Sequence, residues 1–390
     1  MIQISPETQL FIREHSSDDV RALALQAKKY PDIDMPTAIT QIAGRQVAAE
    51  KIPSWREIEE IWYPKHLSLE QCSSEITARY KARLFQGDSL TDLTGGFGID
   101  CSFLATGFKS ATYVERQEEL CEIAAHNFPI LNLNHINVRN EDGVAYLQTM
   151  SPVDCIFLDP ARRNEHGGKT VAISDCEPNV AELEALLLSK ANRVMIKLSP
   201  MLDLSLALKE LKHTQEIHIL SVNNECKELL ILLRQTSPAE IAIHCVNLFT
   251  KGTQEEQHFV FTREQEQRSQ CTYTDSLGNY LYEPNASLLK AGAFRSIAAA
   301  YPVRKLHPNS HLYISDTFIE NFPGRIFRIV NQCSFNNLAD LKKANVTVRN
   351  FPATVAELRK RLHLTEGGDT YLFASTLNNG QKVIIRCEKV

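Results

Sequence analysis

Hydrophobic positions repeat at two different spacings along this chain, and the change of spacing divides it into regions. Between about residues 16 and 63, apolar side chains recur every three or four positions, which predicts helices. Pro31 and Pro36 interrupt this pattern, and a third helix is expected to begin at Pro53 and carry apolar positions as far as Trp62. We therefore expect a helical domain over residues 1–65.

Short apolar runs alternate with helical segments over residues 66–236. Such alternation is typical of an α/β fold in which helices cover a mostly parallel sheet, as in Rossmann-like domains. Two further runs, 217–222 and 229–233, are joined by two asparagines and suit a closing hairpin. The predicted strands of the parallel sheet are residues 89–92, 111–114, 136–139, 154–158 and 194–198.

The pattern changes again after residue 237. Two strands, 239–249 and 258–262, are separated by a polar loop, so residues 237–282 are expected to form a β-rich connecting segment. Strands and helices then alternate to the end, which predicts a small ferredoxin-like α+β module. Its predicted strands are 312–314, 325–330, 346–349, 370–376 and 382–387, and its predicted helices are 336–344 and 354–362.

A glycine-rich stretch follows the first strand of the parallel sheet. Residues 92–98 read D-L-T-G-G-F-G, with Gly95, Gly96 and Gly98, and Asp100 begins the next helix. Glycine lets the backbone take positive φ and approach a ligand closely, and the first turn of a helix presents free N–H groups to it. The stretch therefore predicts a nucleotide-binding turn, although a tight turn without a ligand has the same local pattern.

Acidic residues also stand at the ends of later strands. Glu115 ends the second strand, where a carboxylate can accept hydrogen bonds from both hydroxyls of a ribose; a solvated acid is the alternative. Asp159 and Pro160 end the fourth strand, and the proline fixes a sharp turn. Because ligands of an open parallel sheet lie beyond the carboxyl ends of its strands, we expect these tips and the glycine-rich turn to share one pocket.

Basic residues suggest a polyanionic substrate. Arg162 and Arg163 carry guanidinium groups that match phosphate oxygens, although one of them could instead pair with an aspartate. Lys169 lies beside two glycines in a loop that could cover a substrate. Residues 281–390 carry a net charge of +7 and the rest of the chain −12. A basic C-terminal third is typical of nucleic-acid binding, and uneven surface charge without a partner is the alternative.

Composition excludes several other classes of protein. The ten cysteines stand singly, without a C-x-x-C pair, so we expect no metal site and no disulfide framework. No apolar run reaches the roughly 18 residues that a membrane helix needs, and the first residues lack the profile of a signal peptide. We expect a cytoplasmic protein.

Together these features resemble a bacterial family of class I S-adenosylmethionine-dependent methyltransferases. Residues 92–98 are similar to the first motif of these enzymes, D-x-x-x-G-x-G, and residues 159–162 to the D/N-P-P-Y/F motif of amino-methylating relatives. Here Ala161 replaces the second proline and Arg162 the aromatic residue that stacks on a base. The resemblance extends to the order of domains, in which ferredoxin-like and THUMP-like domains follow the core.

The resemblance implies domain limits, a cofactor and a set of site residues. The implied domains are helical (1–65), methyltransferase (66–236), connecting (237–282), ferredoxin-like (283–322) and THUMP-like (323–390). The implied cofactor is S-adenosylmethionine, with Asp142 near its adenine and Glu141 as the alternative. Expected cofactor-binding residues are Asp92, Thr94, Gly95, Gly96, Phe97, Gly98, Asp100, Glu115, Arg116, Asp142 and Asp159. Asp159 and Pro160 are the expected catalytic residues, and Arg162, Arg163 and Lys169 the expected substrate contacts.

THUMP domains are linked to RNA binding, so the resemblance implies methylation of a structured RNA such as tRNA or rRNA. Two alternatives stay open at this point. One is a methyltransferase for a small molecule or a protein, and the other is a non-catalytic RNA-binding protein with a vestigial core.

Overall fold

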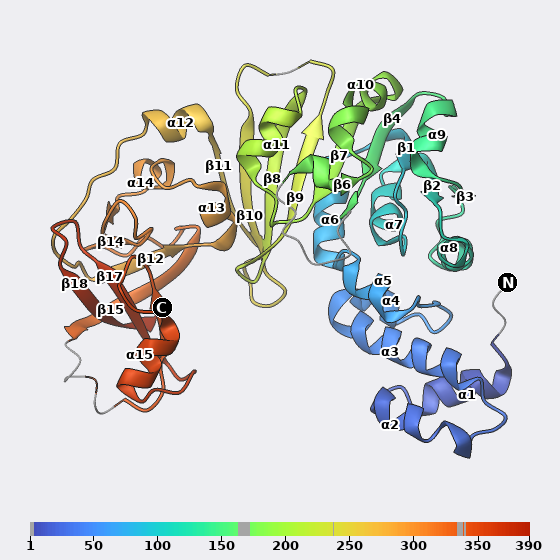
Figure 1. Ribbon diagram of the computed structural model, residues 1–390, viewed down its shortest axis with the longest axis horizontal. Coiled ribbons are helices and arrows are strands. Elements are labelled where there is room, and N and C mark those ends of the chain that lie inside the picture. The colour runs from blue at the N-terminus through green and yellow to red at the C-terminus, as the bar shows by residue number, and fades with distance from the viewer. Residues whose placement is uncertain (1–3, 163–171, 237, 334–337, 339–340) are drawn as a thin grey trace. The chain divides into compact units, whose positions relative to one another are not determined.

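The computed structural model describes residues 4–162, 172–236, 238–333, 338 and 341–390, which fall into two compact units (Figure 1). Unit 1 comprises Met1–Gln215 and Leu230–Ser237, and unit 2 comprises Glu216–Leu229 and Pro238–Val390. Each unit has its own hydrophobic clusters and is described separately.

Unit 1 begins with a group of short helices. Side chains that precede them accept hydrogen bonds from first-turn N–H groups: Ser5 from Thr8, and Asp34 from Thr37. The helix predicted from Pro53 onward is shorter than expected and ends at Arg56. These helices are α1 (Pro6–Glu14), α2 (Val20–Leu25), η1 (Ala27–Lys29), α3 (Met35–Lys51), α4 (Pro53–Arg56) and α5 (His66–Gln71).

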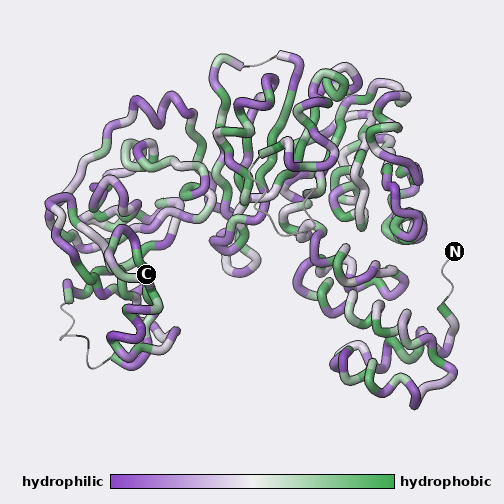
Figure 2. The backbone as a smooth tube through the Cα atoms, in the orientation of Figure 1, coloured by the Kyte–Doolittle hydropathy of each residue, from purple (hydrophilic) through white to green (hydrophobic). Residues whose placement is uncertain are grey.

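The main element of unit 1 is a parallel sheet with the strand order β7-β4-β1-β2-β3. Hydrophobic residues, green in Figure 2, are buried mainly toward the carboxyl ends of its central strands β1, β4 and β7. Chain order reverses between β1 and β4, which makes their carboxyl ends the switch point where ligands bind in such sheets. The strands are β1 (Gly87–Asp92), β2 (Phe108–Glu115), β3 (Ile136–Asn140), β4 (Val153–Leu158) and β7 (Ala191–Leu198).

Helices connect these strands, as the alternating pattern predicted, and the α/β fold class is confirmed. They are α6 (Glu75–Leu84), α7 (Ile99–Ala105), α8 (Glu118–Ile130), α9 (Gly143–Thr149), α10 (Val180–Lys190) and α11 (Leu204–Glu210). A short ribbon, β5 (Ala161–Arg162) and β6 (Cys176–Glu177), follows β4, and η2 (Ile173–Asp175) precedes β6.

The turn of the predicted hairpin lies in unit 2. Asn223 and Asn224 both have positive φ, 49° and 69°, as a two-residue hairpin turn requires. In this unit β10 (Ala242–Leu248) pairs in parallel with β8 (Thr214–Val222) and antiparallel with β11 (Glu256–Thr262). The second strand of the hairpin is β9 (Glu225–Leu233).

A second sheet completes unit 2, with the order β13-β14-β12-β15-β18-β17-β16. The helix predicted for residues 336–344 is not present over residues 341–344, and most of its other residues lie outside the described part of the chain. The strands are β12 (Tyr280–Pro284), β13 (Arg304–Lys305), β14 (Tyr313–Ser315), β15 (Gly324–Cys333), β16 (Asn345–Val348), β17 (Thr370–Thr376) and β18 (Lys382–Lys389). The helices are α12 (Arg263–Arg268), α13 (Ala286–Ala291), α14 (Ser296–Ala300) and α15 (Val355–Leu362).

In the parts of the chain that the structure describes, no helix combines the length and the apolar character needed to cross a bilayer.

One glycine lets the N-terminal helices pack closely. A Cβ added to Gly44 in α3 would lie 2.3 Å from the Cβ of Tyr63, an atom that cannot move without its backbone. Alanine gains about 1 kcal/mol of helix propensity over glycine, but overpacking at such a contact costs about 1–3 kcal/mol or more. We therefore expect Gly44→Ala to destabilise this region, and Glu50→Ala, at an exposed site on α3, to change its stability by less than about 0.5 kcal/mol.

Urea unfolding followed by tryptophan fluorescence tests this prediction, since Trp55 and Trp62 are the two tryptophans of the chain and both lie beside these helices. Equal midpoints for Gly44→Ala and the unmodified protein would contradict it.

Candidate active site

The glycine-rich loop turns the chain sharply from β1 into α7. Gly96 and Gly98 have φ values of +55° and +87°, the left-handed region that favours glycine. Gly95 donates its N–H to Val114 O at 2.9 Å, and a Cβ there would lie 2.3 Å from the Tyr113 ring. The three glycines are thus required by two backbone conformations and one close approach.

Glu115 joins this loop to the tip of β2. Its Oε2 accepts a hydrogen bond from Gly96 N at 2.9 Å, and its Oε1 accepts one from Gln117 N at 2.8 Å. The side chain is largely buried. A carboxylate oxygen accepts more than one hydrogen bond, so both oxygens keep capacity for a ligand while the backbone holds them in place.

Asp159 brings the tip of β4 to the same loop. Its backbone N–H donates to Thr94 Oγ1 at 2.6 Å, and Leu93 N donates to Phe157 O at 3.0 Å. Pro160 follows directly and is buried. Gly96, Glu115 and Asp159 therefore lie at adjoining strand ends, at the switch point of the sheet.

A buried chain of charges extends from Asp159 into the protein. Lys197, at the end of β7, places its Nζ 2.5 Å from Asp159 Oδ2 and 3.4 Å from Asp100 Oδ2. Lys81, in α6, places its Nζ 2.9 Å from Asp100 Oδ1 and 2.9 Å from Ser73 Oγ. Two ammonium groups and two carboxylates alternate here, and Ser73 donates to Asp100 Oδ2 at 2.7 Å.

Burial and charge act in opposite directions on these acids. Burial would raise the pKa of the Asp100 carboxyl, but Lys81, Lys197 and the Ser73 hydroxyl together hold that pKa below its usual value. Burial raises the pKa of Asp159, whose side chain is about one-third exposed, and Lys197 opposes the rise. Asp100 is therefore a buried, ionised carboxylate, whereas the Asp159 carboxyl is partly exposed at the surface of the site.

Lys197 has no role in the sequence analysis, although a signal for it existed. A single lysine in the otherwise apolar run 194–198 is costly to bury and needs a nearby carboxylate. Lys81 lies in a helix with ordinary polar positions, so its complete burial could not be read from the sequence.

Three other predicted residues lie in or near the loop in different settings. The Phe97 side chain packs edge-on against Trp55, with ring centroids 5.2 Å apart, in the hydrophobic cluster of the N-terminal helices. Arg116 is exposed, 3.6 Å from Glu177. Asp142 caps α9, where its Oδ1 accepts from Val144 N and Ala145 N at 3.0 Å each.

The predicted substrate contacts fall at the edge of the described chain. The backbone of Arg162 pairs with Cys176 in the short ribbon after β4. The side chain of Arg162, and all of Arg163 and Lys169, lie outside the described residues.

Comparison with known proteins places this geometry in a family. Residues 280–323 match a ferredoxin-like domain family and residues 324–389 a THUMP domain-like family. A crystal structure from Porphyromonas gingivalis W83, of a protein provisionally named a methyltransferase, is 34% identical over 100% of both chains, with a TM-score of 0.86. This chain belongs to the same family, that of bacterial class I S-adenosylmethionine-dependent methyltransferases with ferredoxin-like and THUMP-like C-terminal domains.

Two other solved structures match part of this chain. An rRNA methylase from Streptococcus thermophilus is 14% identical and covers 41% of this chain and 93% of its own, with a TM-score of 0.30. TrmK of M. capricolum, solved with S-adenosyl-homocysteine, is 12% identical and covers 41% of this chain and 68% of its own, with a TM-score of 0.33. None of the curated proteins matches the sequence.

Asp92 is the most deeply buried acid of the site, with 1% of its surface exposed. Its Oδ1 accepts from Thr94 N at 3.0 Å, while its buried Oδ2 has no hydrogen-bond partner among the described residues. Burial, with the nearby charges of Asp100, Asp159 and Glu115, raises the pKa of Asp92 to about 8.

This raised pKa predicts a specific pH dependence of stability. Between the unfolded pKa of about 3.9 and the folded value, the native state binds more protons than the unfolded state, so the free energy of unfolding falls as pH rises. The slope contributed by one group is at most about 1.4 kcal/mol per pH unit. Asp92→Asn removes this contribution, so the variant should gain stability relative to the unmodified protein from pH 5 to pH 8.

Urea unfolding at several pH values measures the difference. Asp88→Asn, at the exposed amino end of β1, is the control and should follow the unmodified protein. Parallel profiles for Asp92→Asn and the unmodified protein would show that Asp92 ionises at its ordinary pH in the native state.

Proposed function

We propose that this protein transfers a methyl group from S-adenosylmethionine to a structured RNA. The observation that carries the proposal is the meeting of the glycine-rich loop, Glu115 and Asp159 at one switch point. The Gly96 N–H and the Asp159 N–H are both held by contacts within this cluster.

The residues present fit a cationic nucleoside cofactor. A Cβ added at Gly96 would meet only Thr94 O, at 3.7 Å, within 4 Å, so the backbone there is open to close approach among the described residues. Glu115 would hold the ribose hydroxyls, and the buried Oδ2 of Asp92 has no hydrogen-bond partner among the described residues. The acidic groups of Glu115 and Asp159 suit the positive charges of a sulfonium and an ammonium group.

The cofactor supplies an electrophilic methyl group when bound, and the protein's task is to hold the acceptor in line with it, about 3 Å away. Asp159 is suited to accept a hydrogen bond from the attacking amine or hydroxyl, because its side chain is about one-third exposed. Lys197 fixes the Asp159 carboxyl from the buried side. Arg162 stands where amino-methylating relatives have the aromatic residue of the motif, so no aromatic ring at that position would stack on a base.

Substitution of Asp159 should separate catalysis from cofactor binding. We expect Asp159→Ala to lower methyl transfer by about 100-fold or more, the usual contribution of a positioned acid or base, while calorimetry shows cofactor binding retained. Glu115→Gln should instead weaken cofactor binding by about 10-fold or more, because a hydrogen bond to a charged group contributes about 1.5–3 kcal/mol.

The assay is transfer of labelled methyl to RNA from cells that lack the protein, with mass spectrometry of the nucleosides. Asp88→Asn serves as the matched control, and Asp159→Asn tests whether shape without charge is enough. Normal turnover by Asp159→Ala would show that Asp159 has no role in the reaction. Failure of the unmodified protein to bind S-adenosylmethionine would support a vestigial core.

The RNA part of the proposal is supported by the THUMP-like match and by the basic C-terminal third. Many of the basic side chains in that third are neutralised by nearby acids. Glu283 pairs with both Arg325 and Arg349, and Lys305 is buried. Three further pairs are Arg304 with Asp316, Arg328 with Glu388, and Arg359 with Glu366.

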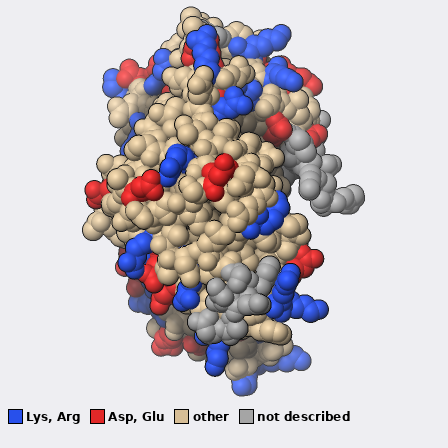
Figure 3. Space-filling model, turned by 90° about the vertical axis from the view of Figure 1, so that its left-hand side faces the viewer, with Lys and Arg blue, Asp and Glu red and all other residues tan. Residues whose placement is uncertain are grey.

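The face in Figure 3 agrees with this pairing, since lysine and arginine side chains are scattered among acidic ones around a broad uncharged area. Lys342, Lys343 and Lys360 are exposed, and Lys360 lies in the last turns of α15. Thr365, which follows α15, donates to Lys342 O at 2.9 Å, so these lysines belong to one part of the THUMP-like segment. They are the best candidates for phosphate contact.

Salt dependence of RNA binding tests these contacts. Each neutralised phosphate contributes about 0.7–0.9 to the slope of log K against log salt, so the double variant Lys342→Ala, Lys360→Ala should lower that slope by about 1.4–1.8. The control is Lys28→Ala, Lys29→Ala, two exposed lysines near α2. An unmodified protein that binds RNA without salt dependence would favour a small-molecule or protein substrate.

A further inference from the structure

A second group of chemically reactive side chains lies in unit 2, on one face of its strands. Glu216 and His218 are two residues apart on β8 and so point to the same side of the sheet. His244 on β10 is the register partner of His218. His258 on β11 lies two positions from Val260, the register partner of His244, and therefore on that face as well.

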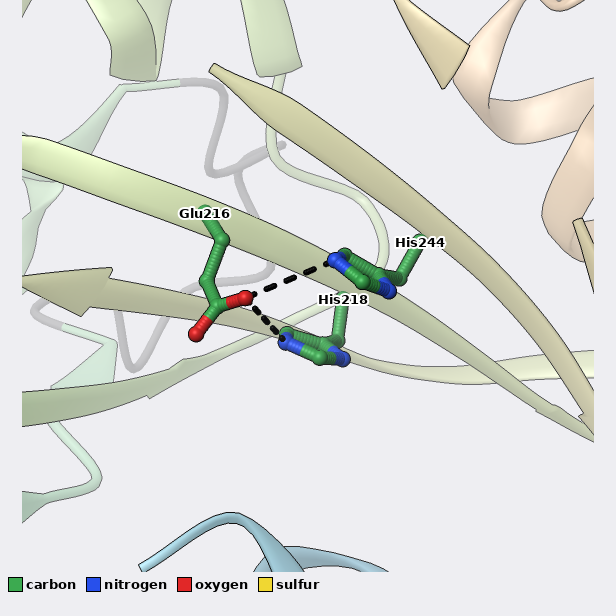
Figure 4. Close-up of side chains that lie close together, drawn as sticks. All are labelled: Glu216, His218 and His244. Carbon is green, nitrogen blue, oxygen red and sulfur yellow. Dashed lines mark ion pairs between the residues drawn. The ribbon is translucent and has the colours of Figure 1, made fainter. Parts of the chain in front are cut away.

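The donor atoms of three of these residues converge. Glu216 Oε2 lies 3.4 Å from His244 Nε2 and 3.7 Å from His218 Nε2, and one ligand atom from each residue lies within 4.8 Å of the others. Figure 4 shows a nitrogen of each ring facing the same carboxylate oxygen. The two rings stack with centroids 4.3 Å apart and an interplanar angle of 11°, which keeps these nitrogens side by side.

These distances suit a metal ion. Zinc binds histidine nitrogen and carboxylate oxygen at about 2.0–2.2 Å, so two ligands of one ion lie at most about 4.2 Å apart. Both separations from Glu216, 3.4 Å and 3.7 Å, are below this limit. An ion could therefore enter with small side-chain shifts and no change of backbone.

The three side chains differ in their exposure to solvent. The His218 side chain is 3% exposed, His244 19% and Glu216 29%, so the group is reachable from the Glu216 side.

His258 adds the outer support that metal-binding histidines commonly have. Its Nε2 lies 3.1 Å from His244 Nδ1. When His244 Nδ1 carries the proton and donates to His258, the lone pair of His244 is on Nε2, the atom that faces Glu216.

We propose that Glu216, His218 and His244 form a binding site for a divalent transition-metal ion of the zinc class. Two histidines and one carboxylate leave at least one coordination position for water. The ion would link β8 to β10 within unit 2. The sequence analysis expected no metal because it relied on closely spaced cysteines, whereas these ligands come together through strand register.

The test uses tag-free, full-length protein stripped with a chelator. Zn²⁺ is titrated in competition with a chromophoric chelator, and Co²⁺ absorption reports on coordination. We expect one ion per chain, binding at least 100-fold weaker in Glu216→Gln and in His244→Gln, and 10–100-fold weaker in His258→Gln, the usual effect of an outer partner. Zn²⁺ should also raise the melting temperature of the unmodified protein and not that of Glu216→Gln.

His15→Gln, remote in sequence and in the N-terminal helices, is the matched control and should bind Zn²⁺ like the unmodified protein. The cysteines are present in every variant, so adventitious thiol binding contributes equally to all of them. His218 is buried, so its variant is used only if circular dichroism shows a folded chain. Zn²⁺ binding by the unmodified protein that is no tighter than that of Glu216→Gln and His244→Gln would overturn the proposal.

Discussion

The contact on which the site of unit 1 depends is the pairing of buried Asp100 with Lys81 and Lys197. Lys81 is completely buried, and an ammonium group in that position is tolerated only when carboxylates surround it. Removing one partner of a buried pair typically costs about 3–5 kcal/mol, because the other charge is left uncompensated. The network therefore constrains α6, α7 and the end of β7 to one arrangement.

This arrangement also determines where Asp159 can lie. Lys197 contacts both Asp100 and Asp159, so the tip of β4 is tied to the first turn of α7 by one ammonium group. The Thr94 hydroxyl makes a second tie, to the Asp159 backbone. A reacting group needs such support, because a catalytic side chain without fixed neighbours loses its orientation to thermal motion.

Local features were predictable from the sequence, and features that depend on packing were not. The glycine-rich turn and the acidic end of β2 follow from backbone conformation and strand length, both of which leave marks in neighbouring residues. Lys197 acquires its role only when β7 lies beside β4, and Phe97 turns toward Trp55 only when the N-terminal helices pack on the loop. His218 and His244, 26 positions apart, become neighbours through a parallel register that no local pattern reveals.

Opposing effects on the Asp159 carboxyl bear on the chemistry proposed for it. Burial alone would favour the protonated acid, which could donate but not receive a proton, whereas full exposure would make it a weak base. Lys197 at 2.5 Å limits the rise that burial causes, and the carboxyl keeps one-third of its side chain open. The exposed part of the carboxyl could accept a hydrogen bond from the attacking amine or hydroxyl of the proposed reaction. The lysine is thus a positioning residue in the proposed reaction, because it contacts Asp159 and ties it to Asp100.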